Sequence, residues 1–246
     1  REPLPTKLSE LLRTSGRAAL FASVTATRSI YTLRTILVLA SIGWALLQWA
    51  RHAGSGRPGM GFLGMQLVLA LLVESIGCWM AVSKLNNAPL YDLYIVMECL
   101  LLLLMIRAFG ALNLPMLAGL FALVCCSALV EYQYWNDPSR FLMITSSLSS
   151  LFIVGASLTV LWHESESGTQ SPFANSVFFI SFAHLLYFAA SATLVAPIIL
   201  LMEDDPELGS ILYYFSQLVC VARYVSIGIS CHLPNDVNGN AKHHSM

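Results

Sequence analysis

Seven stretches of this chain, each about 20 residues or longer, are almost entirely apolar, and this constrains the fold more than any other feature. A helix needs roughly 20 such residues to cross a bilayer, and only helices or closed barrels satisfy every main-chain polar group there. The composition agrees, because 57% of the 246 residues are hydrophobic and only 11% are charged, whereas about a quarter are charged in a soluble domain. We therefore expect an all-α polytopic membrane protein, a bundle of seven transmembrane helices.

Glycine, proline and asparagine mark the turns between these stretches, as in "NNAP" and "EDDPE". They divide the chain into an N-terminal arm (1–29), the bundle (30–232) and a polar C-terminal tail (233–246). Pro197 lies inside the long sixth stretch, so we expect a kink there. The expected spans are 30–50, 60–83, 90–110, 115–135, 141–162, 173–202 and 208–231.

The positions of lysine and arginine predict the orientation in the membrane. In short loops these residues stay on the cytoplasmic side. The arm is rich in them, and Lys84 and Arg140 fall on its side of the membrane if the spans alternate. We expect a cytoplasmic N-terminus and a C-terminal tail on the outside. Because the first residue is Arg1 rather than methionine, we also expect the natural chain to begin upstream.

The arm itself has the pattern of a short amphipathic helix. Leu8, Leu11 and Leu12 fall on one side of such a helix, while Arg13 and Arg17 lie on the other. We expect this helix to lie on the inner membrane surface. The alternative is a partly ordered basic tail.

The cysteines and histidines give little sign of a metal site. Cys231 is the one cysteine expected near the outer surface, and the other five lie within spans, so we interpret them as small core residues rather than disulfide partners. No close cysteine and histidine spacing is present. His52, His163 and His232 could gather at the outer face and bind zinc, but single surface histidines are common, and we expect no metal.

Several functions of multi-span proteins are not supported by the residues. A retinal protein needs a lysine in its last span, and the three lysines of this chain all lie outside the span cores. The motif "HESES" lacks the second histidine of a zinc protease. Ser157 and His184 form only a loose serine–histidine pair, and such residues within spans more often join helices by hydrogen bonds. The net charge of −1 gives no sign of nucleic-acid binding.

Ionisable groups within the spans are the best candidates for function, because a charge at the bilayer centre costs about 3 kcal/mol or more. Glu98 lies about 12 Å past the expected start of the third span, and Glu74 about 14 Å before the end of the second, at ~1.5 Å per residue. We expect the two to be adjacent. Arg223 and His184 are the other deep polar groups, and we expect Arg223 nearer the outer side.

The third span places further polar groups on the face of Glu98. Asn87, Tyr91 and Tyr94 share this face and approach the carboxylate from the cytoplasmic side. On the second span Ala70, Glu74, Gly77 and Ala81 share a face, where small residues would allow close helix packing. Two interpretations of Glu98 stay open. It either fixes helix register through a hydrogen bond to Tyr94, Glu74 or a serine of "TSSLSS", or it shares a proton with Glu74 beneath a cavity reached by His184 and Arg223.

The region from Glu74 to Arg107, with its asparagine-rich turn and the pattern Tyr91-x-x-Tyr94-x-x-x-Glu98, resembles small seven-span bacterial inner-membrane proteins that have no assigned activity. The resemblance implies a bacterial inner membrane and directs attention to Asn87, Tyr91, Tyr94 and Glu98. It identifies neither a substrate nor a cofactor, so both stay unknown.

We expect this protein to act by binding rather than by catalysis, as an accessory subunit of a membrane assembly or as a small-ligand-sensing module. Short loops favour partners within the bilayer, either lipid or other membrane subunits. A transporter or proton path built on Glu74, Glu98, His184 and Arg223 is the alternative, although no inverted repeat is visible. An intramembrane enzyme that modifies lipid is the third interpretation.

Overall fold

A computed structural model of the chain describes residues 33–52, 58–135, 142–166 and 175–233. The chain divides into two compact units, residues 1–38 and 39–246. In the first unit, the described residues are the helical segment 33–38. The N-terminal arm, for which the sequence predicts an amphipathic helix, lies outside the described residues, as does the tail from 234 onward. The architecture below is that of the second unit.

Seven helices in the described ranges are long and apolar enough to cross a membrane, which confirms the predicted all-α membrane bundle. From α2 onward the predicted boundaries agree with the structure to within four residues, the largest difference being at α5, which continues to Glu166. The helices are a first helix Leu33–His52, α2 (Met60–Val82), α3 (Ala88–Ala108), α4 (Leu114–Trp135), α5 (Met143–Glu166), α6 (Ser176–Asp204) and α7 (Pro206–Ser230).

Local sequence explains where several helices begin. Asn175 caps α6, because its side-chain oxygen accepts hydrogen bonds from the main-chain N–H groups of Val177 and Phe178. Asp205 caps α7 in the same way, and Pro206 takes the first helical position, where a missing N–H costs nothing. These caps satisfy donors that a helix leaves unpaired at its start.

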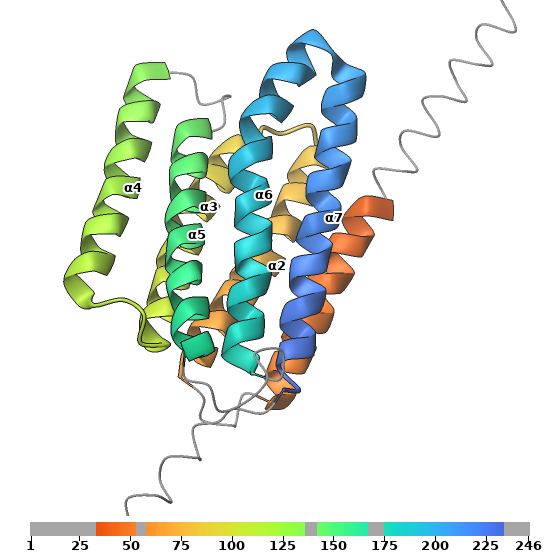
Figure 1. Cartoon of the computed structure of the whole chain (residues 1–246). Coiled ribbons are helices and arrows are strands. Elements are labelled where there is room, and N and C mark those ends of the chain that lie inside the picture. The colour runs from red at the N-terminus through yellow and green to blue at the C-terminus, as the bar shows by residue number, and fades with distance from the viewer. Residues whose placement is uncertain (1–32, 53–57, 136–141, 167–174, 234–246) are drawn as a thin grey trace, which may run out of the picture. The chain divides into compact units, whose positions relative to one another are not determined.

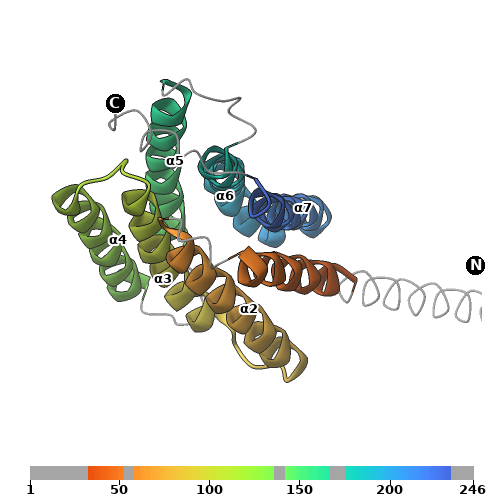
Figure 2. The ribbon, with the colours of Figure 1, turned by 90° about the horizontal axis from the view of Figure 1, so that it is seen from below.

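The helices pack in a simple order (Figures 1 and 2). Helices α5, α6 and α7 follow one another side by side, α3 contacts α2, α4 and α5, and α4 lies at one edge against α3 and α5. Helix α6 runs without a break through Pro197 to Asp204, and its last turns lean toward α7. The kink expected at Pro197 stays a prediction, made because a proline within a helix removes one main-chain hydrogen bond.

Tryptophans of residues 39–52 fit against glycines of two neighbouring helices. A Cβ atom added at Gly64 of α2 would overlap the ring of Trp49, and one added at Gly228 of α7 would overlap the ring of Trp44. The indole N–H of Trp49 also donates to the main-chain oxygen of Met60, at 2.7 Å. The absence of side chains at these glycines therefore lets residues 39–52 pack closely against α2 and α7.

Candidate functional site

Glu98 lies at the middle of α3 and is only 5% exposed. One of its carboxylate oxygens, Oε1, accepts three hydrogen bonds, from the Tyr94 hydroxyl at 2.7 Å, Arg223 Nη2 at 2.8 Å and Gln66 Nε2 at 3.0 Å. Tyr94 belongs to the preceding turn of α3, whereas Gln66 and Arg223 come from α2 and α7. The carboxylate therefore joins three helices at one point within the bundle.

Arg223 provides the positive charge that balances Glu98. Its side chain is buried, and the pair forms a salt bridge. The guanidinium carbon lies 4.5 Å from the ring centre of Tyr187, 4.9 Å from that of Phe188 and 5.2 Å from that of Tyr224. The faces of aromatic rings attract a cation, and the attraction grows when water is excluded. The rings and the carboxylate together replace part of the hydration that arginine loses on burial.

The sequence placed Arg223 nearer the outer side than Glu98, and the main-chain positions agree with this order. Arg223 lies seven residues before Ser230, the end of α7, and Glu98 lies ten residues before Ala108, the end of α3. At ~1.5 Å per residue the difference in depth is about 5 Å, which a long guanidinium side chain can span. The two side chains therefore meet although their main-chain positions differ in depth.

One interpretation of the sequence paired Glu74 with Glu98 through a shared proton, and this stays a prediction. In the structure the Tyr91 hydroxyl donates to Glu74 Oε2 at 3.2 Å, while Glu98 accepts from Tyr94, Gln66 and Arg223. Gly77 leaves the space for the ring, because an added Cβ would lie 2.6 Å from the Tyr91 hydroxyl oxygen. The expected small-residue face of α2 therefore does pack closely against α3.

The remaining predicted residues lie in two different places. Asn87 stands at the start of α3, where its main-chain oxygen accepts from Leu90 and Tyr91, and its side chain makes no capping bond. His184 is only 1% exposed on α6, and its ring stacks on Phe188, one of the rings beside Arg223. Four of the predicted residues thus lie close together in the structure, namely Tyr94, Glu98, Arg223 and His184. The three hydrogen bonds to Glu98 Oε1 do not involve Tyr91 or Asn87.

His184 has a defined hydrogen-bonding state. Its Nδ1 lies 2.8 Å from the main-chain oxygen of Ile180. A carbonyl oxygen can only accept, so Nδ1 carries the proton and Nε2 of the neutral ring is left as an acceptor. Nε2 has no hydrogen-bond partner among the described residues.

Other buried polar atoms near the centre of the bundle also lack partners within the described part of the chain. They are Arg223 Nε and Nη1, Gln66 Oε1, and the hydroxyl oxygens of Ser157 and Ser181. Ser181 lies one turn before His184 on α6. Ser157 lies nine residues before the end of α5 and His184 eight residues after the start of α6, so the two are at similar depth. Buried polar groups are almost always hydrogen-bonded, to protein, water or ligand.

Sequence reasoning missed Gln66 and Tyr187. Gln66 lies four residues before Ala70, on the face of α2 that the sequence identified, so its position on that face was a usable signal. Tyr187 had no such signal, because most residues of α6 are apolar and their pattern favours no face.

Two further acidic residues have a structural role at the start of α5. Glu131 of α4 accepts hydrogen bonds from the main-chain N–H groups of Ile144 and Thr145 and from the Thr145 hydroxyl, all at 2.9 Å. Asp92 of α3 accepts from the N–H of Leu142 at 3.0 Å. Both carboxylates satisfy unpaired donors at a helix N-terminus, where negative charge is favoured. They therefore fix α3 and α4 against the start of α5.

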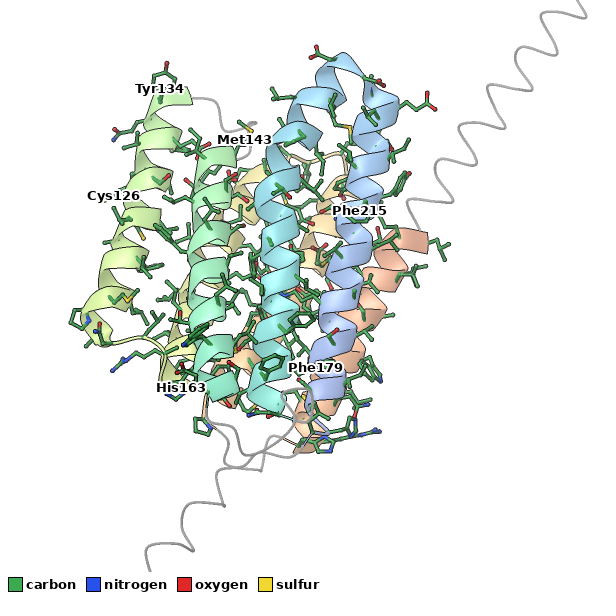
Figure 3. The ribbon with its side chains drawn as sticks, in the orientation of Figure 1. Cys126, Tyr134, Met143, His163, Phe179 and Phe215 are labelled. Carbon is green, nitrogen blue, oxygen red and sulfur yellow. The ribbon has the colours of Figure 1, made fainter. Side chains whose placement is uncertain are left out.

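The cysteines and histidines can be compared with the sequence analysis residue by residue. None of the six cysteines forms a disulfide, and the described residues contain no group of three or more potential metal ligands. His52 and His232 do meet, with ring centres 4.5 Å apart. His163 lies at the lower end of α5 in Figure 3 and forms no such group with them.

Comparisons of the chain with known protein families, with curated proteins and with solved structures return no match.

Proposed function

We propose that this protein acts by binding a small neutral ligand inside its helix bundle, as a small-ligand-sensing module of the membrane. The observation that carries the proposal is the set of buried atoms without partners around Arg223 and His184. Leaving such atoms unpaired costs about 1–3 kcal/mol each, so a molecule that bonds to them would be held firmly. Ordered water could satisfy the same atoms and is the competing occupant.

The chemistry of the atoms limits what the ligand can be. Arg223 Nε and Nη1 only donate hydrogen bonds, whereas His184 Nε2 accepts. A ligand that meets both needs one acceptor and one donor, as in a hydroxyl or an amide. The Glu98–Arg223 pair carries no net charge, so the site favours a neutral group over an anion.

The experiment identifies the small molecules that stay bound during purification and compares wild type with two variants. Extraction and mass spectrometry of wild type in mild detergent should find one compound near one copy per chain. The His184→Phe variant, which lacks the acceptor, should lose it, and His163→Phe, which changes an exposed histidine of α5, should keep it. The proposal is contradicted if both variants retain the compound equally, or if wild type itself carries no compound. Either result leaves water as the occupant.

A proton path receives less support from the geometry. Glu98 already has a cation and two further donors, and Glu74 is bonded to Tyr91. These bonds support the structural interpretation of Glu98, in which the carboxylate fixes the register of the helices.

An accessory-subunit role is the second candidate, and the exposed side of α4 favours it. Ala118, Ala122 and Cys126 follow one another at four-residue intervals on this helix, and all three are exposed; Figure 3 marks Cys126. Small residues at this spacing allow a helix of another subunit to approach closely. Ala122→Phe should release a co-purifying membrane protein, whereas Leu129→Phe, at another exposed position of α4, should retain it. Equal retention would argue against this role.

We also propose a bacterial inner membrane and a cytoplasmic N-terminus, on the basis of the resemblance and of the lysine and arginine distribution. Cysteines placed at Ser55, Ser167 or Ser245, in a chain without its native cysteines, should react with an impermeant thiol reagent from outside. A cysteine at Asn86 should not react. Labelling at Asn86 from outside would reverse the orientation.

A further inference from the structure

A pair of histidine rings lies where the first helix and α7 end. His52 is the last residue of the first helix, and His232 follows the end of α7 by two residues. Their ring centres are 4.5 Å apart and their planes meet at 68°. The two residues come from opposite ends of the bundle sequence, so their meeting depends on the packing of the first helix and α7.

One of the two rings already has the orientation that a metal ligand needs. His52 Nδ1 lies 2.9 Å from the main-chain oxygen of Gln48. Because the carbonyl only accepts, Nδ1 carries the proton and Nε2 keeps its lone pair. Histidines that bind metals usually donate their other N–H to a carbonyl or carboxylate in this way, which holds the ring in place.

The spacing of the rings also fits a shared ion. Two imidazoles that bind one tetrahedral Zn²⁺ at about 2.0 Å have ring centres about 5 Å apart. The observed 4.5 Å needs a shift of about half an ångström to reach that spacing. His232 is exposed and His52 half-buried, so an ion could arrive from the aqueous side and keep water as its other ligands. Cys231 is buried and its thiol donates to the Ile227 oxygen, which keeps it from the site.

We propose that His52 and His232 form a two-histidine site for a divalent transition-metal ion, Zn²⁺ in the first instance, that ties the first helix to α7. The site stands apart from the ligand site around Arg223, and neither depends on the other. Since an ion that binds the folded chain stabilises it, metal binding should show as a higher melting temperature.

The experiment titrates purified, tag-free protein in detergent with Zn²⁺ and records binding by calorimetry and unfolding by circular dichroism. Wild type should bind one Zn²⁺ per chain and melt at a higher temperature with it. His52→Gln, which keeps a donor for the Gln48 oxygen, and His232→Ala should each weaken binding at least tenfold and abolish the rise in melting temperature. His163→Ala should behave as wild type.

The tail contains His243 and His244, which could bind Zn²⁺ by themselves. The double variant His243→Ala/His244→Ala distinguishes Zn²⁺ binding by the tail from binding by His52 and His232. If His52 and His232 hold the ion, this variant should keep the Zn²⁺-dependent rise in melting temperature. The inference is overturned if this double variant loses the rise, if His52→Gln keeps it, or if wild type shows none. A His52→Gln chain that melts as wild type does without metal shows that the substitution leaves the fold intact.

Discussion

Replacing Glu98 by glutamine tests whether its charge is needed to hold Arg223 in the bundle. Glutamine keeps the shape of the side chain and one carbonyl oxygen, but it removes the negative charge. The guanidinium cannot lose its proton, so a buried cation would be left without its counter-charge. Breaking a buried ion pair from one side costs about 3–5 kcal/mol. We expect Glu98→Gln to destabilise the protein by an amount in this range.

The three hydrogen bonds to Glu98 Oε1 give a similar figure. They measure 2.7, 2.8 and 3.0 Å. A bond to a charged acceptor contributes roughly 1 kcal/mol more than a bond to a neutral one, so three such bonds would lose about 3 kcal/mol. At about 2–4 °C per kcal/mol for a chain of this size, the melting temperature should fall by roughly 6–12 °C.

Thermal unfolding in detergent, followed by circular dichroism, measures this loss. Glu207→Gln is the control, since that carboxylate is exposed in the first turn of α7 and its loss should cost less than about 1 kcal/mol. The double variant Glu98→Gln/Arg223→Met removes the stranded cation and should be more stable than Glu98→Gln alone. If the double variant instead loses the sum of the two single losses, the two side chains do not interact and the reasoning fails.

Three other changes test contacts elsewhere in the bundle. Gly77→Ala should lower the melting temperature, because the new Cβ would collide with Tyr91. Gly119→Ala is the control, since an added Cβ there meets nothing within 4 Å and should stabilise the helix by up to about 1 kcal/mol. Equal shifts in the two variants would show that the contact between Gly77 and Tyr91 is not tight. Glu131→Gln should speed amide hydrogen exchange in the first turn of α5 about tenfold, which corresponds to a loss of about 1.4 kcal/mol in the free energy of local opening. Unchanged exchange rates would contradict the capping role of Glu131. Trp49→Phe should cost about 0.5–1.5 kcal/mol through its lost indole donor, measured by chemical unfolding, and no loss would argue against that hydrogen bond.

Contacts within one helix followed from the sequence. Tyr94 and Glu98 are four residues apart, and residues at that spacing are neighbours on any helix, so their hydrogen bond was among the expected ones. The sequence also predicted Glu74 beside Glu98, because a short turn joins α2 to α3 and makes them neighbours. The structure shows a hydrogen bond to Glu74 from Tyr91, which the sequence had placed on the same face of α3 as Glu98.

The sequence by itself determined the number of helices and their bounds to within four residues, because the thickness of a bilayer and the need to satisfy every main-chain group leave few alternatives. Only the tertiary structure decided that Arg223 pairs with Glu98 and that His52 meets His232. In a soluble helix the apolar stripe reveals the buried face. In a membrane the lipid-facing side is as apolar as the packed side, so the sequence pattern does not tell which faces meet.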